Sequence, residues 1–312
     1  MTRRPAGLLA ASAIASVAVA LAGAGCGLGP GSGTSAVTVT VTRNFGATSV
    51  VQLTEKRVPG SETVMRALER HFNVGLRYGG GFVESINGVA GNSTRRDWFY
   101  YVNGIEAPKG AAVTTVHRGD RIWWDLHDWA ATDSVPAVVG SFPEPFLHGS
   151  GGKRFPTVLE CVSDASAACK RVSAELSGLG VPVATQLIGT GSGTDSLAVV
   201  VGTWHDLRGE IVASLLQRGP GASGVYARFS ADGRSLILLD PSARAVRTIG
   251  PGAGLVAASA QGSAVPTWLI TGTDPSGVEA AAAAFTPAAL RDHFALAVQG
   301  ASRLPLPLRS AS

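Results

Sequence analysis

The residue types best suited to binding chemistry are concentrated in one short stretch of the chain. Residues 78–129 contain four of the six tryptophans and three of the four tyrosines. Aromatic rings that gather on a surface favour a flat, partly apolar ligand or a protein partner. The side chains that we predict to contact a ligand are Tyr78, Phe82, Trp98, Tyr100, Trp123 and Trp124.

Strand geometry divides these rings between two faces. In extended strands over residues 98–102 and 122–126, the even-numbered side chains share one face and the odd-numbered ones the other. A small domain has a single core, so one aromatic face must be exposed or covered by something else. Either a ligand or the second domain could cover it. The loop 78–82 (YGGGF) is either a glycine bulge or a mobile, aromatic-bearing loop over a ligand.

The ionisable residues of this stretch match no catalytic or metal pattern. His117, Asp125, His127 and Asp128 lie close together in the sequence, but their spacing is not that of metal ligands. The glycine-rich run 189–193 lacks the Lys-Ser/Thr pair of a phosphate-binding loop, and no Gly-x-Ser-x-Gly elbow occurs. We therefore predict no metal site and no catalytic residue, and a protein that is not an enzyme.

The first 26 residues have the layout of a secretory leader. Arg3 and Arg4 form a positive tip, and residues 6–24 are small or apolar. Residues 21–26 (LAGAGC) resemble a bacterial lipobox, although Gly23 stands where such a box normally has Leu, Val or Ile. We predict an exported protein, anchored by lipid on Cys26 to the outer face of the cytoplasmic membrane. Cleavage with full secretion is the main alternative, and an uncleaved anchor is the other.

Cysteine parity agrees with export. If Cys26 carries a lipid, Cys161 and Cys169 remain as a pair. An even number of cysteines in an oxidising compartment favours a disulfide, here one that closes a short loop. Two buried free thiols are the alternative.

The charge balance excludes one class of partner. The formal net charge is +4, or +2 without Arg3 and Arg4, and the basic residues are scattered. This is too little charge for a nucleic-acid footprint. Beyond the leader, the chain has no run of about eighteen uninterrupted apolar residues that could span a bilayer. We expect the mature part to be soluble.

Breaks in composition divide the chain into segments. A leader over 1–26 and a Gly/Ser/Pro linker over 27–36 precede a compact first domain over 37–131. A Pro/Gly-rich linker over 132–153 separates it from a second domain over 154–312, whose role the sequence does not indicate.

Local patterns predict the elements that position the aromatic residues. In the first domain we expect strands over 37–42 and 50–58, a helix over Glu62–Phe72 capped by Ser61, and hairpin turns at Asn87-Gly88 and Asn103-Gly104. This order is that of a β-grasp-like fold. The second domain alternates strands and helices, which indicates an α/β layered domain and an α+β chain overall. Its expected elements are strands near 157–162, 181–188 and 197–201, helices over 164–176, 204–217, 278–285 and 287–298, and a frayed tail over 304–308.

Two segments of the first domain carry a family resemblance. Residues 97–104 (DWFYYVNG) and 119–124 (GDRIWW) are similar to the transcobalamin-like C-terminal domain family, whose members show a Trp-led strand, a Val-Asn-Gly turn and a Gly-Asp turn before a strand ending in Trp or Tyr. Residues 60–64 (GSETV) fit the helix start of that family, and the resemblance covers residues 36–130. In the eukaryotic transporters this domain caps a bound corrinoid. The resemblance therefore implies cobalamin or another flat tetrapyrrole as ligand and an envelope transporter as partner.

The sequence thus predicts an exported, non-enzymatic binding protein of the cell envelope. The alternative is a structural or partner-binding envelope module, in which the aromatic residues form the interface between the two domains.

Overall fold

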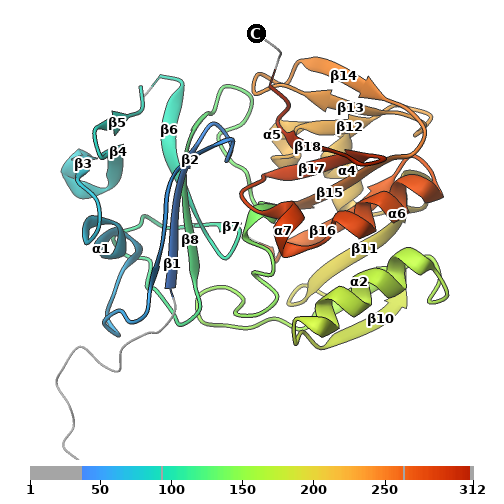
Figure 1. The fold of residues 1–312 in the computed structure, drawn as a ribbon, viewed down its shortest axis with the longest axis horizontal. Helices are drawn as coiled ribbons and strands as arrows, with labels where there is room; N and C mark the ends of the chain where they lie inside the picture. The colour runs from blue at the N-terminus through green and yellow to red at the C-terminus, as the bar shows by residue number, and fades with distance from the viewer. Residues whose placement is uncertain (1–36, 93, 263, 310–312) are drawn as a thin grey trace, which may run out of the picture.

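The computed structural model describes residues 37–92, 94–262 and 264–309. The predicted leader, Cys26 and the linker 27–36 lie outside these residues. A five-stranded sheet and a seven-stranded sheet stand side by side, and we call them the N-terminal and the C-terminal sheet (Figure 1). Within the described residues, no helix has both the length and the apolar character needed to cross a membrane.

The N-terminal sheet has the strand order β2-β1-β8-β6-β7. Its central pair, β1 and β8, is parallel, whereas the neighbouring pairs are antiparallel. A hairpin, a helix and a closing strand parallel to the first are the elements of a β-grasp arrangement, and the predicted α+β class is confirmed. The elements are β1 Val37–Arg43, β2 Thr48–Glu55, α1 Val64–Glu69, β6 Arg96–Val102, β7 Ile105–Glu106 and β8 Arg121–Asp128, with a small sheet of β3 Val74–Arg77, β4 Phe82–Ile86 and β5 Val89–Ala90 beside α1.

Local sequence explains most of this part. Alternation in β1 buries the valines at 37, 39 and 41 beneath α1. The two Asn-Gly pairs form the β4–β5 and β6–β7 turns, with positive φ at both residues of each pair. The helix begins later than predicted because Thr63, rather than Ser61, is its N-cap, and the Thr63 hydroxyl accepts a hydrogen bond from the Arg66 backbone N–H at 3.3 Å. It also ends at Glu69 rather than at Phe72.

The C-terminal sheet has the order β10-β9-β11-β16-β15-β17-β18. The first four strands run parallel, and the remaining pairs are antiparallel. Helices α2 and α6 pack on one face, while α3, α4, α5 and a three-stranded sheet pack on the other. The strands are β9 Thr157–Cys161, β10 Val183–Leu187, β11 Leu197–Thr203, β15 Ala253–Ser259, β16 Thr267–Gly272, β17 Ala295–Gln299 and β18 Ser302–Leu306. The covering elements are α2 Ala167–Gly178, α3 Trp204–Leu207, α4 Ile211–Gln217, α5 Pro220–Ser223, β12 Ala227–Phe229, β13 Leu236–Leu239, β14 Ala245–Ile249 and α6 Pro275–Ala284.

Three expectations for this half are wrong. The helix expected over 204–217 is broken into α3 and α4. Of the helix expected over 287–298, only α7 (Pro287–Leu290) forms. Residues 291–294 connect it to β17, and residues 295–298 of that strand are all buried. The tail expected to fray pairs with β17 as β18. An edge strand tolerates Pro305, because the N–H that proline lacks would face the unpaired side of the strand and would have no partner there.

The connection over 132–153 is packed against the C-terminal sheet. It contains a 3₁₀ turn, η2 Val139–Ser141. Phe142 and Phe146 are buried there against Trp268 and Phe285. Hydrophobic side chains therefore hold this Pro/Gly-rich segment in a defined place.

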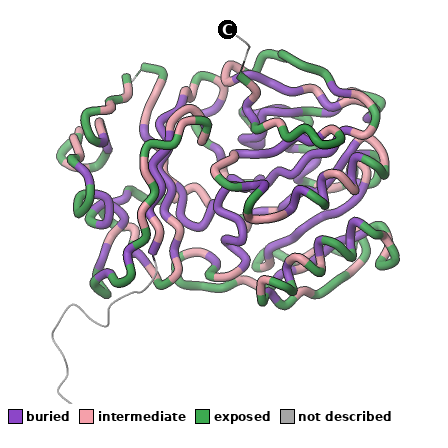
Figure 2. The backbone as a smooth tube through the Cα atoms, viewed as in Figure 1, coloured by how far each residue is buried: buried purple, intermediate pink, exposed green. Residues whose placement is uncertain are grey.

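The buried side chains form three clusters. One lies between the N-terminal sheet and α1, and one lies under α2 and α6. The third is shared, because Phe45, Tyr101 and Trp123 pack with Tyr226 and Phe294 from the other half. Figure 2 shows buried residues along the strands of both sheets.

Candidate functional site

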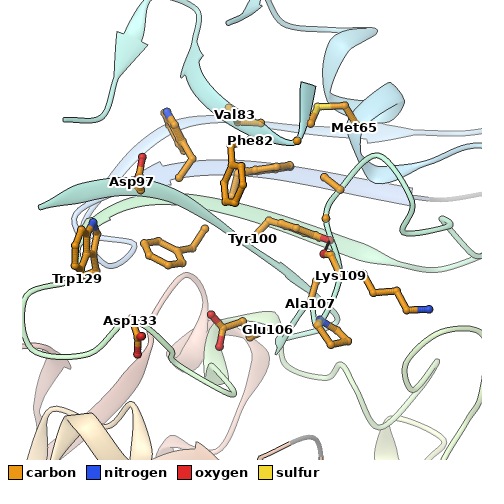
Figure 3. A pocket seen from close by; sticks show the side chains of 17 residues that line it. Met65, Phe82, Val83, Asp97, Tyr100, Glu106, Ala107, Lys109, Trp129 and Asp133 are labelled. Carbon is orange, nitrogen blue, oxygen red and sulfur yellow. Dashed lines mark hydrogen bonds between the residues drawn. The ribbon is translucent and has the colours of Figure 1, made fainter. Parts of the chain in front are cut away.

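A cavity of about 590 Å³ opens on the α1-facing side of the N-terminal sheet (Figure 3). We call it the aromatic cavity. It lies between β6 and the β4 strand, and residues 106–111 close one end. Its lining side chains include Met65, Phe82, Val83, Asp97, Trp98, Phe99, Tyr100, Glu106, Lys109, Trp124, Trp129 and Asp133.

Strand alternation and hydrogen bonds hold the inner rings in place. Tyr100 stacks on Trp124 of the neighbouring strand, with their ring centres 4.8 Å apart. The Tyr100 hydroxyl lies 2.8 Å from the Thr114 Oγ1 and also contacts the Lys109 carbonyl, and burial raises the pKa of this phenol. The Trp98 Nε1–H donates to the Val89 carbonyl at 3.2 Å. These contacts define the positions of the rings on the inner wall of the cavity.

Two large rings at the rim are exposed to solvent. Tyr78 is 78% exposed and Phe82 is 62% exposed, and they meet edge to face with ring centres 5.7 Å apart. Tyr78 lies in a short turn, η1 Tyr78–Gly80, whose three residues all have positive φ, and Phe82 follows as the first residue of β4. The Arg77 guanidinium lies over the Tyr78 ring and pairs with Asp97 at 2.6 Å. This arrangement presents a flat apolar edge at the mouth of the cavity.

Acidic groups line the side of the cavity that faces the C-terminal half. Glu106 is half-buried, and Ser134 donates to its carboxylate at 2.5 Å. Burial raises the pKa of Glu106, and the nearby negative charge of Asp133 raises it further. Sequence reasoning missed Glu106, Asp133, Asp97 and Trp129 as lining residues. Only Trp129 carried a signal, as one of the clustered tryptophans.

Of the six residues predicted to contact a ligand, five gather here. Phe82, Trp98, Tyr100 and Trp124 line the aromatic cavity, and Tyr78 contacts Phe82 at its rim. Trp123 does not join them and points to the opposite face of the sheet. Adjacent residues of a strand face opposite ways, so Trp123 and Trp124 cannot line the same side.

The opposite face is the seam between the two halves. Trp123 lies edge-on to Phe294, with ring centres 5.2 Å apart, and its Nε1–H donates to Thr42 Oγ1 at 2.7 Å. Tyr101 is also fully buried against Phe294. The second domain therefore covers the odd-numbered face and the even-numbered rings face the cavity, except that Phe99, which stacks on His127, also borders the cavity.

The ionisable residues that the sequence singled out serve this seam. Asp125 is fully buried and accepts hydrogen bonds from the Thr42 hydroxyl and from the Phe45 and Gly46 backbone amides. His127 lies 2.9 Å from Asp125. Its ring stacks on Phe45, at 4.5 Å between ring centres. These contacts satisfy the buried carboxylate.

Neither His117 nor Asp128 adds a metal site. His117 lies 3.7 Å from Asp120, and Asp128 pairs with Arg95. Among the residues that the structure describes, no group of three or more His, Cys, Asp or Glu side chains is arranged to hold a metal ion.

The predicted disulfide is confirmed. Cys161, at the end of β9, is bonded to Cys169 in the first turn of α2, with the Cα atoms 6.1 Å apart. Both residues are buried, so the bridge ties α2 to the sheet from inside the core.

Comparison with known proteins gave one partial family match and similarities to solved structures. A search of curated proteins found no match. Two solved structures are similar at low identity. One is a candidate metal-binding protein from Ruminococcus gnavus, at 16% identity and a TM-score of 0.25, covering 30% of this chain and 97% of the other. The second is haptocorrin in complex with Cbi, at 18% identity and a TM-score of 0.25, covering 30% of this chain and 26% of the other. A family model described as a domain of unknown function, DUF4430, matches residues 61–128, which include the strands that carry the cavity's aromatic side chains.

Proposed function

We propose that this chain is an exported, non-enzymatic binding protein whose aromatic cavity holds a flat, largely apolar ligand. The observation that carries the proposal is a preformed cavity of about 590 Å³ with aromatic walls and two exposed rings at its mouth. Small-molecule sites are typically concave, largely apolar and of about 300–1,000 Å³. Exposed rings at the mouth would bury their apolar surface only when a ligand is bound.

The specific ligand that we propose is a corrinoid. The support is the sequence resemblance of residues 97–104 and 119–124 to the transcobalamin-like family. A corrinoid ring is larger than a typical drug-sized molecule, so one edge of it would enter the cavity and lie against Phe82 and Tyr100. The rest would remain at the surface beside Tyr78.

The proposal that the protein is exported rests on its leader-like N-terminal residues and on its disulfide. The leader-like residues 1–26 point to secretion, and Cys26 would carry the lipid. The disulfide between Cys161 and Cys169 supports this, because disulfides persist in oxidising compartments.

A partner-binding module is the second candidate. The observation that favours it is the seam, where Tyr101 and Trp123 already bury their rings against Phe294 of the same chain. In this candidate the exposed pair, Tyr78 and Phe82, would contact a protein in the same manner.

Calorimetric titration of cyanocobalamin into the mature chain tests the corrinoid proposal. Phe82→Ala is the informative variant, since an exposed ring can be removed without disturbing the core. A stacking contact between two rings contributes about 0.5–1.5 kcal/mol, so the loss of one ring should weaken binding roughly 2- to 13-fold. Ile211→Ala is the matched control, because Ile211 is 66% exposed in the other half of the molecule.

The outcomes separate the two candidates. Binding that weakens in Phe82→Ala and not in Ile211→Ala supports a corrinoid in the cavity. The absence of heat at about millimolar ligand, a concentration that detects even weak complexes, ends the corrinoid proposal. Binding that is unchanged in Phe82→Ala means that the ligand binds elsewhere and that the aromatic cavity is not the binding site.

A further inference from the structure

Charge is distributed unevenly around the aromatic cavity. Glu106 and Asp133 lie along one side, and Met65, Phe82 and Val83 lie along the opposite side, with Tyr100 between them (Figure 3). The first side is acidic and the second is apolar. The cavity therefore has a direction, with an acidic end and an apolar end.

The acidic end has no ion-pair partner among the residues that the structure describes. Neither Glu106 nor Asp133 forms an ion pair with any residue that the structure describes. Asp97, the third carboxylate of the lining, differs because Arg77 neutralises it at 2.6 Å. The ammonium of Lys109 lies at the far end of the cavity from Asp133 (Figure 3). Glu106 and Asp133 thus have no salt bridge, although Ser134 donates a hydrogen bond to Glu106 and Asp133 is exposed to solvent.

Aromatic rings accompany these carboxylates. Trp129 and Phe99 also line the cavity, and Trp129 lies toward the same end as Asp133 (Figure 3). Trp129 is half-buried, and the Phe99 ring stacks on His127 at 4.4 Å between ring centres. The face of an indole or phenyl ring attracts cations through its quadrupole, with Trp the strongest. Carboxylates beside aromatic faces form the surroundings that bind an organic cation and repel an anion.

We infer that the ligand of the aromatic cavity carries a positive charge, which lies among Trp129, Glu106 and Asp133 while its flat apolar body lies against Phe82 and Tyr100. This inference rests on the proposed function, because it assumes that the cavity is the binding site. Among flat macrocycles, it disfavours those with carboxylate substituents on the edge that enters. It favours planar or ring-bearing molecules with a fixed cationic centre.

Three flat probes of nearly equal size test the inference on the mature chain at pH 7.5. N-methylacridinium is a permanent cation, acridine is neutral at this pH, and anthracene-9-carboxylate is an anion. Fluorescence titration should give the cation an affinity at least about tenfold above that of acridine, with the anion weakest. Because the charge of N-methylacridinium does not titrate, a pH effect on its binding would report on the protein.

The variant pair identifies the groups responsible. In Glu106→Gln/Asp133→Asn, the affinity for N-methylacridinium should fall to about that of acridine, a loss of roughly tenfold, while acridine binding is unchanged. Asp164→Asn is the matched control, because Asp164 is exposed in the C-terminal half. It should leave all three affinities unchanged.

Each remaining outcome decides one question. Equal binding of cation and neutral probe, or a double variant that keeps the preference, overturns the charge inference and leaves the cavity as a binding site. Failure of all three probes to bind also overturns the charge inference, whereas the cyanocobalamin titration described above decides the proposed function separately. Loss of acridine binding in the double variant shows that the carboxylates shape the cavity rather than select charge, and also overturns the inference.

Discussion

Replacing Phe294 by alanine should loosen both halves of this protein at once. Phe294 is only 3% exposed and lies edge-on to Trp123 and His127, with ring centres 5.2 and 5.3 Å away. It also packs on Phe45 and Tyr101 at 5.2 and 5.6 Å. A buried Phe→Ala change costs about 3–5 kcal/mol, a value that already includes most of these ring contacts. We expect a loss of about 4 kcal/mol in the free energy of unfolding, which corresponds to a fall of roughly 10 °C in Tm for a chain of this size.

The location of the effect matters as much as its size. Phe294 belongs to the cluster shared by the two sheets, so hydrogen exchange should accelerate in β8 as well as in β17. Phe285→Ala is the control, because Phe285 is equally buried but contacts Phe142 and Trp268 on the other face of the C-terminal sheet. It should accelerate exchange around β16 and not in β8.

Two results would refute this reasoning. A loss below about 1 kcal/mol for Phe294→Ala would mean that the seam collapses around the missing ring or is not packed as described. Faster exchange confined to the C-terminal sheet would mean that the two halves unfold independently and that the shared cluster does not couple them.

Three further predictions follow from single features. Removing the disulfide by Cys161→Ser/Cys169→Ser should lower the free energy of unfolding by about 2.5 kcal/mol, the value of the chain-entropy model for a separation of eight residues. Urea unfolding measures this loss. Thiol counting on the unreduced wild type should find no pair of free thiols. Burial raises the pKa of Glu106 above 4.5, so the folded state holds the proton more tightly than the unfolded state, and the free energy of unfolding falls as the pH rises from about that value. Glu106→Gln should therefore be more stable than wild type at pH 7. Equal stability at pH 7 would contradict a raised pKa for Glu106. Cys26→Ser should release the protein from membranes, and unchanged retention with no lipid label on the wild type would count against the predicted anchor.

Much of the architecture follows from local sequence. The Asn-Gly turns, the alternating valines of β1 and the pairing of Cys161 with Cys169 each depend on a few neighbouring residues or on cysteine parity alone. The even-numbered rings of β6 and β8 could be assigned to one face before any fold was known, because strand periodicity is exact over short runs. These features needed no information about distant parts of the chain.

Other features depend on contacts that no local pattern contains. Residues 295–299 are rich in alanine, as helices are, but burial in the middle of a sheet makes them a strand. Strand periodicity separated Trp123 from Trp124 but could not say which face the C-terminal half would cover. The acidic end of the cavity joins Glu106 of β7 and Asp133 of the 132–153 connection, which become neighbours only when the chain folds. The sequence by itself determined which side chains share a face, whereas only the tertiary structure decided what lies opposite them, since long-range packing is set by the energy of the whole core.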